Sequence, residues 1–575
     1  MILWSWFILL FFFRSAWADV PYCPSVRLLG ERISFSDTEI HLFCGDPKSH
    51  AWKHIPAYQA KLVLRGLFQS RGYLSPEFRE EGGVLIVSRG RKSRVKKVRA
   101  VAENDELARK IRRDVYRLFE KRLLTTKLLN SMEGETMAQI RKRGYPCGKV
   151  RSEVNVNTDT VTLIVHEGPK HDFGEISREP IEGLHEKALL RFYPMEASQR
   201  FNGELLDLVE KRLTRAEVVS GTYFLESCDE EGRDFSLEQE FITGPPRTLR
   251  YGAGASTEAG PMVRVRWSNN RMGKMASSLS ATLEASFRVQ SLKLVSDYYR
   301  WPGKPRRSFY SQLEVTRESQ YDYQQFLTRL RPQMKWTEDR GRYGHVWIAG
   351  PSFENGNFRS SEKTEVRSFS NMALEASLQR TAHEYELYDV HPQSGSQQMV
   401  TFSYRHPALG FVPSITRLDT SVVHLGRLTN LWRGTLIGGV HVRAGSAFTR
   451  STAGLENLPP EVKFFGGGSD DLRGFLLRTL PKNDGLGALT RVLGKFELRQ
   501  TNFFHQKLEA FSFLDAGQFG RHSVRLDPRL WYSPGVGIRW LSPIGLVQAY
   551  WARSLATHPR EDLGHFLYAG LGGTF

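Results

Sequence analysis

The sequence is poor in cysteine, in long apolar runs and in acidic charge. Four Cys in 575 residues cannot be the main source of stability, so a disulfide scaffold is excluded. Beyond the N-terminus no stretch approaches the roughly 18 consecutive apolar residues of a transmembrane helix. The mean hydropathy of −0.40 is still compatible with a membrane barrel, because barrel strands alternate lipid-facing and lumen-facing side chains.

Enzyme motifs are lacking too. There is no G-x-S-x-G nucleophile elbow, no H-E-x-x-H zinc motif and no C-x-x-C pair, and the 16 His are dispersed. The sequence therefore predicts neither catalysis nor a cofactor nor a metal site. With 40% hydrophobic and 25% charged residues, it predicts folded domains rather than a disordered chain. A length of 575 residues requires at least two of them.

The N-terminus resembles an export signal. An apolar run from Ile2 to Phe13 is followed by Ala16-Trp17-Ala18, which is typical of a signal peptide over residues 1–18. The run is too short to span a bilayer, which needs roughly 20 residues. No Lys or Arg precedes it, so a membrane-tethered N-terminus is the alternative.

Export bears on both the charge and the cysteines. The chain has 80 Lys and Arg against 62 Asp and Glu, a formal net charge of +18. In an exported protein we expect this positive charge to attract anionic lipid or an acidic partner rather than nucleic acid. In an oxidising compartment Cys23 and Cys44 are a candidate disulfide, and Cys147 and Cys228 are candidate free thiols.

The N-terminal part of the chain repeats one order of features three times. Each segment has a strand, amphipathic helices and two further strands, and closes at a glycine followed by a new segment: Gly90, Gly168 and Gly244. The spacings between these glycines, 78 and 76 residues, indicate an array of like domains. We predict three α+β domains over residues 19–91, 92–170 and 171–245.

A basic run, residues 89–99, lies at the junction of the first two repeats. One interpretation is a solvated hinge followed by the outer face of a strand. The other is an electrostatic docking patch for anionic lipid or an acidic partner.

From residue 246 onward the helical periodicity ends. Charged and apolar residues alternate, as in residues 491–499, which predicts half-buried strands. A charged face is tolerated on the wet inner side of a barrel. At roughly 20 residues per strand and connection, residues 246–575 predict an all-β, 16-stranded antiparallel transmembrane barrel. A soluble β-sandwich is the alternative.

Five barrel segments occur in the order seen in a known family: residues 250–260, 464–475, 494–497, 513–517 and 532–545. With the three repeats they resemble the BamA superfamily, and within it the TamA family of translocation and assembly factors. The repeats are similar to POTRA domains. Leu472 and Leu546 depart from the usual residues of these motifs. The resemblance implies POTRA repeats in the periplasm and a barrel in the outer membrane of a Gram-negative bacterium.

The resemblance also implies a loop that folds into the barrel lumen and carries the motif Leu472, Arg473, Gly474 and Phe475. On their predicted strands Glu497 and Asp515 have inward parity, and a guanidinium binds carboxylates bidentately. We predict an Arg473–Glu497–Asp515 cluster that pins the loop inside the barrel. The alternative is three independently solvated lumen charges.

Glycines mark both predicted end strands of the barrel. The first strand has Gly252 and Gly254, and the last has Gly570, Gly572 and Gly573. Because glycine weakens a strand, we predict a seam between residues 249–256 and 567–575 that opens sideways. The alternative is that these glycines fit a crowded wall. The last strand, with Leu571 and the terminal Phe575, resembles the C-terminal signal of outer-membrane barrels.

The resemblance implies an assembly or translocation factor that acts without a cofactor. Its expected partners are a TamB-like protein anchored in the inner membrane, unfolded outer-membrane protein clients such as autotransporters, and outer-membrane lipid, with a link to phospholipid transport. One alternative is a BamA-like general insertase, which usually carries more POTRA repeats. Another is a two-partner secretion transporter for a dedicated exoprotein, which usually carries two.

Overall fold

The computed structural model describes residues 20–29, 33–49, 53–196, 198–360, 365–388, 392–410, 414–431, 434–449, 455–482, 485–543, 545–558 and 560–571. The predicted signal peptide lies outside the described residues. The chain divides into two compact units. The first contains the first two repeats with residues 200–202 and 228–235, and the second contains the rest of the third repeat together with the barrel.

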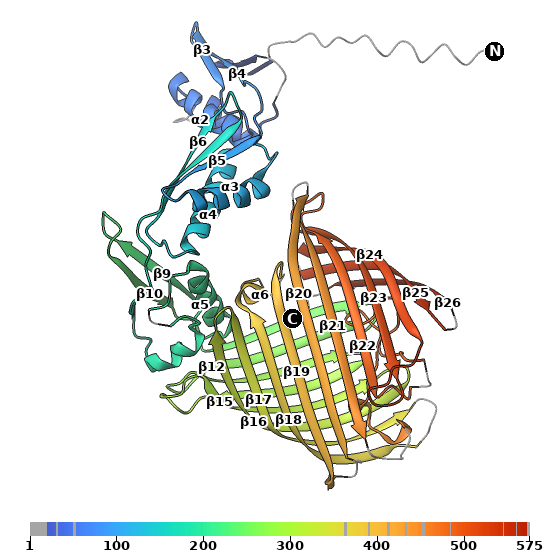
Figure 1. Ribbon diagram of the computed structural model, residues 1–575. Helices are drawn as coiled ribbons and strands as arrows, with labels where there is room; N and C mark the ends of the chain where they lie inside the picture. The colour runs from blue at the N-terminus through green and yellow to red at the C-terminus, as the bar shows by residue number, and fades with distance from the viewer. Residues whose placement is uncertain are drawn as a thin grey trace, which may run out of the picture. The chain divides into compact units, whose positions relative to one another are not determined.

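The first repeat packs two helices on a mixed sheet (blue in Figure 1). Its elements are β1 (Val20–Cys23), β2 (Val26–Leu29), α1 (Asp37–Cys44), α2 (Ala57–Ser70), β3 (Glu77–Glu81) and β4 (Val84–Ser88), with the sheet order β1-β2-β4-β3. Helix α1 begins with a capping box between Ser36 and Glu39. A disulfide joins Cys23 to Cys44.

The second repeat has the predicted order of one strand, two helices and two strands. Its elements are β5 (Lys97–Val101), α3 (Asp105–Phe119), α4 (Thr126–Arg141), β6 (Lys149–Asn155) and β7 (Thr160–His166), with the sheet order β5-β7-β6. Val98, Ile111 and Leu163 are among its buried core residues. The alternation in β7 and the helical spacing in α3 therefore bury one face of each element.

The basic run between these repeats is partly structural. Ser93 and Val95 are fully buried, and the cations that flank them, Arg91 and Lys96, both pair with Asp159 at 3.1 and 3.0 Å. Burial raises the pKa of Asp159, but its bonds to Lys96 and Arg91 outweigh burial and hold that pKa below its usual range. This part of the run anchors the segment between the two repeats.

The third repeat lies mostly in the second unit. Its elements are β8 (Ile176–Arg178), the 3-10 helix η1 (Glu186–Phe192), α5 (Gly203–Arg215), β9 (Gly221–Cys228) and β10 (Phe235–Ile242), with the sheet order β8-β10-β9. One expectation is wrong here. Cys147 and Cys228 are not free thiols, because a disulfide joins them across 81 positions of sequence. Their separation hid the pairing, since each lies in a different repeat.

The prediction of a 16-stranded antiparallel barrel is confirmed. In Figure 1 the ring runs from green to red. Its strands are β11 (Arg247–Ser256), β12 (Gly260–Met272), β13 (Ser277–Ser286), β14 (Val289–Tyr298), β15 (Arg307–Ser319), β16 (Tyr323–Arg340), β17 (Tyr343–Ser360), β18 (Arg367–Ala382), β19 (Gly395–Gly410), β20 (Ile415–Leu431), β21 (Gly434–Thr449), β22 (Thr490–Gln500), β23 (Leu508–Gly520), β24 (Leu530–Ser542), β25 (Gly545–Ala556) and β26 (Glu561–Leu571).

The wall is uneven in height. Strands β16 and β17 have 18 residues each, whereas β11 has 10. A short helix, α6 (His383–Leu387), follows β18 at the end of the barrel where the third repeat lies. Among the described residues, no helix is long and apolar enough to cross a membrane.

Candidate functional site

The connection between β21 and β22 fills part of the lumen. Its described residues, 455–482 and 485–489, include two 3-10 turns, η2 (Leu455–Asn457) and η3 (Pro460–Val462). Phe464, Leu472 and Leu480 of this loop form a buried apolar cluster with wall residues such as Phe519 and Trp531. The loop therefore brings its own hydrophobic core into the barrel.

Two glycines set the path of the loop. Gly467 has φ of +103°, and a Cβ there would lie 2.1 Å from the carbonyl oxygen of Leu476. Gly468 has φ of +98°, and a Cβ there would lie 2.4 Å from Oε1 of Glu258. A side chain at either position would meet both strain and a collision. Gly468 thereby allows the loop to approach the turn between β11 and β12.

Arg473 lies against both carboxylates that the sequence analysis paired with it. Its Nε and a terminal nitrogen donate to the two oxygens of Asp515, each at 2.8 Å, and its other terminal nitrogen donates to Glu497 at 2.6 Å. Its backbone N–H also donates to Asp515 at 3.0 Å. The side chains of Arg473 and Asp515 are 4% and 0% exposed, and the guanidinium stacks 3.7 Å from the ring centre of Phe513.

The other three motif residues pack against the wall. Leu472 is fully buried, and the ring of Phe475 meets that of Trp531 edge-on at 5.9 Å. Gly474 has φ of +101°, and a Cβ there would lie 2.3 Å from the hydroxyl of Ser533. The motif thus contacts the wall through a charge, two apolar side chains and a close backbone approach.

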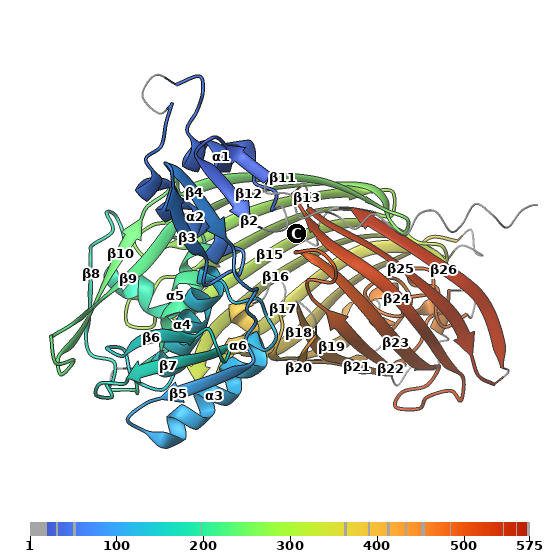
Figure 2. The same ribbon diagram turned by 90° about the horizontal axis from the view of Figure 1, so that it is seen from above.

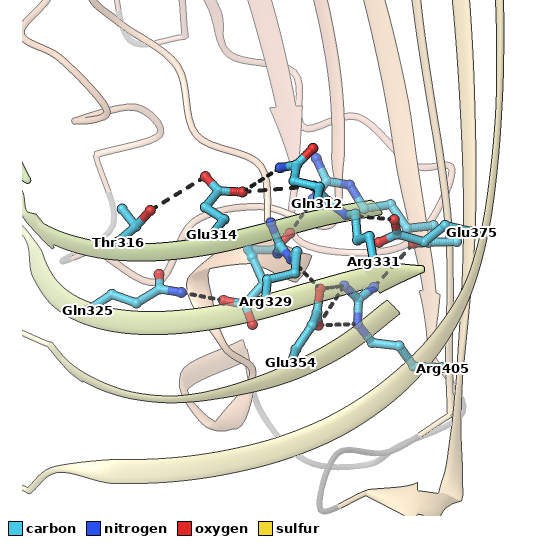
Figure 3. A network of polar contacts seen from close by, with 12 residues as sticks. Gln312, Glu314, Thr316, Gln325, Arg329, Arg331, Glu354, Glu375 and Arg405 are labelled. Atoms are coloured by element: carbon cyan, nitrogen blue, oxygen red, sulfur yellow. Dashed lines mark hydrogen bonds and ion pairs between the residues drawn. The ribbon is translucent and has the colours of Figure 1, made fainter. Parts of the chain in front are cut away.

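A second charged network in the lumen has no counterpart in the sequence analysis. Figure 3 shows Glu354 of β17 between Arg329 of β16 and Arg405 of β19. The carboxylate is fully buried, with ion-pair distances of 2.8 Å to Arg329 and 3.0 Å to Arg405. Strand parity indicates that each residue faces inward, but only the barrel register could show that these three meet.

This network borders a cavity of about 760 Å³ and also reaches the loop. Gln325 of β16 donates to Glu461 of η3 at 2.7 Å, and Arg331 pairs with Glu375 at 2.9 Å (Figure 3). Within the described ranges, no group of three His, Cys, Asp or Glu residues is arranged to hold a metal ion.

The pairing of the first and last strands is described only as far as Leu571. Among the described residues, β11 and β26 share two register positions, Ala255 with Leu571 and Ser256 with Gly570. The backbone N–H of Thr257 adds a bond to the carbonyl of Ala569 at 2.9 Å. Figure 2 shows β11 and β26 as the two ends of the ring of strands.

The predicted seam glycines are placed only in part. Gly252 and Gly254 pair with Arg264 and Met262 of β12. Gly570 pairs with Ser256 of β11. Gly572, Gly573 and the terminal Phe575 lie outside the described residues. Leu571 is the last residue of β26.

The third repeat holds the barrel through α5, a contact that the sequence did not reveal. Arg212 donates to Asp339 of β16 at 2.9 and 3.1 Å and to Glu386 of α6 at 2.8 and 2.9 Å. His383 of α6 also bonds to Asp339 at 3.1 Å. Burial lowers the pKa of Arg212, but the bonds to Glu386 and Asp339 outweigh burial and raise it above its ordinary value. The guanidinium therefore stays charged in this contact.

Comparisons with known proteins give one family. The model of the Omp85 superfamily domain matches residues 235–575. Solved structures similar to this chain include BamA from Haemophilus ducreyi lacking POTRA domains 1–3, at 13% identity and a TM-score of 0.49, covering 83% of this chain and 99% of that one. CdiB from Escherichia coli matches at 13% identity and a TM-score of 0.48, covering 89% of this chain and 97% of that one.

Proposed function

Because the chain belongs to the Omp85 superfamily, whose domain covers residues 235–575, we propose that it inserts or translocates proteins at the outer membrane. The POTRA-like repeats face the periplasm and receive the client, and the barrel passes it through the seam. The loop cluster around Arg473 stabilises the wall formed by β22, β23 and β24 while the seam opens.

The family match over residues 235–575 is the observation that supports this proposal. The seam is the place proposed for the client, because β11 and β26 are joined by backbone pairing, which the structure describes at Ala255 with Leu571 and Ser256 with Gly570. Backbone N–H and C=O groups that become unpaired when a seam opens can accept another strand.

The finer proposal is a TamA-like role. Its periplasmic repeats bind a TamB-like partner anchored in the inner membrane, and its clients are a subset of outer-membrane proteins, including autotransporters. A contribution to phospholipid transport is part of the same proposal. The three α+β repeats before the barrel support this role over the alternatives.

Reconstitution tests the general proposal. The full chain is placed in liposomes and given an unfolded outer-membrane barrel protein, whose folding is followed by its heat-modifiable mobility in gels. We expect faster and more complete folding than in empty liposomes. A matched control uses liposomes that contain an unrelated barrel of similar size. Equal client folding in the two preparations would contradict the proposal.

Site-specific photo-crosslinking in cells tests the finer role. Tyr58 on α2 of the first repeat is 77% exposed, so a crosslinker there reaches a bound partner. Capture of a large, inner-membrane-anchored, β-rich protein would support the TamA-like role. Capture of outer-membrane lipoproteins would favour the BamA-like insertase, and capture of one secreted protein would favour the two-partner transporter.

A further inference from the structure

The hairpin of β11 and β12 is held at its periplasmic end by the third repeat. Glu217, just after α5, accepts hydrogen bonds from Thr248 at 2.7 Å, Ser268 at 2.9 Å and Asn270 at 2.7 Å. It also forms an ion pair with Arg250. The Glu217 side chain is only 12% exposed. One carboxylate from outside the barrel thus binds both strands of the hairpin.

The same hairpin is held at its other end by the lumenal loop. Glu258, in the turn between β11 and β12, accepts a hydrogen bond from the Ser469 hydroxyl at 2.8 Å and from its backbone N–H at 3.3 Å. Gly468 favours this approach, because its φ of +98° suits glycine and a Cβ there would lie 2.4 Å from Oε1 of Glu258 and displace the carboxylate. The loop that carries Arg473 is therefore bonded to the seam hairpin as well as to β22 and β23.

The two anchors lie far apart on one stiff element. Strands β11 and β12 pair without interruption at ten positions. The eight steps from Thr248 to Ser256 correspond to about 26 Å of strand. An element held at two such distant points resists both rotation and translation.

The last strand is held differently. It pairs with β25 at ten positions, and its ion pairs also run to that side of the barrel, from Glu561 to Arg529 and from Asp562 to Arg553. Tyr568 stacks on Tyr550 of β25 with ring centres 4.8 Å apart. Its hydroxyl also contacts Ser256 and Ser469, next to the described pairs with β11. Among the described residues, most of the contacts of β26 therefore bind it to β25.

We infer that Glu217 and Glu258 are positioning residues that hold the β11–β12 hairpin as the stationary edge of the seam, so that the seam opens by departure of β26. This inference rests on the proposed function, because it assigns the moving part of a seam that admits a client. The third repeat and the loop then fix the position of one edge while the other edge leaves.

Distance measurements between spin labels test which edge moves. Val263 on β12, Leu567 on β26 and Phe353 on β17 are 52%, 71% and 43% exposed, and each is replaced by a labelled Cys. The four native Cys are in disulfides, so they do not take the label. The full chain is measured in liposomes by double electron–electron resonance, with and without an unfolded client barrel protein.

We expect the client to move the label at 567 relative to 353 by about 5 Å or more, the width of one strand. The distance from 263 to 353 stays unchanged. In the double variant Glu217→Gln/Glu258→Gln, the 263–353 distance also shifts and broadens when the client is added. Ser469→Ala removes a single hydroxyl donor to Glu258 and should give the same broadening to a smaller extent. This milder variant tests the inference even if the double variant does not fold.

The matched control is Glu284→Gln. Glu284 accepts a hydrogen bond from Arg264 of β12 at 2.6 Å, but it lies within the barrel wall, on β13. The substitution should leave the 263–353 distance unchanged. Heat-modifiable mobility in gels shows whether each variant is folded. If Glu217 and Glu258 served only the stability of the barrel, their substitution would change this mobility first.

The inference is overturned if the client moves the label at 263 as far as the label at 567. It is also overturned if the double variant keeps residue 263 stationary. Should the client fold in the liposome assay while residue 263 moves, the proposed function stands and only the stationary edge is wrong. When neither label moves and no client folds, both are wrong.

Discussion

The wall that receives the lumenal loop and the seam between β11 and β26 are held by different kinds of contact. At the wall, Arg473 makes four hydrogen bonds to two carboxylates on β22 and β23, and Phe475 packs on β24. At the seam, the described residues are joined by backbone pairing at Ala255 and Ser256 and by the contact of the Tyr568 hydroxyl with Ser256. Buried charge pairs thus join the loop to the wall, whereas backbone and hydroxyl hydrogen bonds join the described part of the seam.

The difference is chemical as well as geometric. The wall contacts combine buried charge pairs with aromatic packing, which are costly to separate in a low dielectric. The described contacts of the seam are backbone hydrogen bonds, each worth about 1 kcal/mol net, and the hydroxyl contact between Tyr568 and Ser256. The loop links the two regions, because Ser469 bonds Glu258 beside the seam while Arg473 binds the wall.

The largest effect is expected when the wall is broken. Arg473→Glu places three carboxylates together in a site where Arg473 and Asp515 are 4% and 0% exposed. Breaking such a buried pair costs about 3–5 kcal/mol, so we expect the barrel to assemble poorly. The measurement is the amount of heat-modifiable protein in the outer membrane. The control Arg553→Glu makes the same charge change in an exposed pair with Asp562 and should leave assembly intact. Normal insertion and activity of Arg473→Glu would refute the pinning cluster.

Locking the seam should abolish activity and leave the fold intact. Ser256→Cys/Gly570→Cys places two thiols at a register pair of β11 and β26. Oxidation should stop client folding in liposomes, and reduction should restore it. A control pair, Thr328→Cys/Asn355→Cys, joins β16 and β17 at a register position within the long wall and should not change activity. The wild type, treated with the same reductant, accounts for its own two disulfides. A locked protein that still folds clients argues against sideways opening.

A smaller effect is expected in the second charged network. Glu354→Gln keeps one oxygen between Arg329 and Arg405 but removes the charge that both guanidiniums face. We expect a loss of roughly 2–3 kcal/mol in barrel stability, measured as a lower thermal unfolding midpoint in detergent. Client folding below that midpoint should be unchanged, because Glu354 contacts neither seam strand. A large loss of activity in the stable temperature range would show that the two regions are coupled through this network.

The smallest effect lies outside the barrel and depends on pH. The pKa of Asp159 is lowered in the folded second repeat, so its pairing contributes stability above the unfolded pKa of about 3.9 and loses it as the pH falls further. Asp159→Asn should therefore increase hydrogen exchange of residues 91–97 at pH 7. The difference from the wild type should shrink as the pH falls below about 3.9 and through the lowered pKa of folded Asp159. A difference that does not change as the pH falls would mean that the charge of Asp159 is not the cause.

The candidate site was accessible to sequence reasoning only where parity and a motif coincided. The inward parity of Glu497 and Asp515 and the resemblance of residues 472–475 together predicted a cluster of three charged side chains. In the structure the guanidinium of Arg473 lies 2.8 Å from Asp515 and 2.6 Å from Glu497. No motif marked Glu354, and its partner Arg405 lies 51 positions away. The contacts of Glu217 were also missed, because they join a repeat to a barrel that the sequence treats as separate domains.

The sequence by itself determined the type and order of the secondary-structure elements. Alternation of charged and apolar residues predicted the barrel strands, and the recurring order of helices and strands predicted the three repeats, because each period follows from the geometry of a single element. Only the tertiary structure decided which lumen charges meet, that Cys147 pairs with Cys228, and which described positions of β11 and β26 face each other. These depend on strand register and on the packing of distant segments, and a register shift of one position turns every side chain to the opposite face.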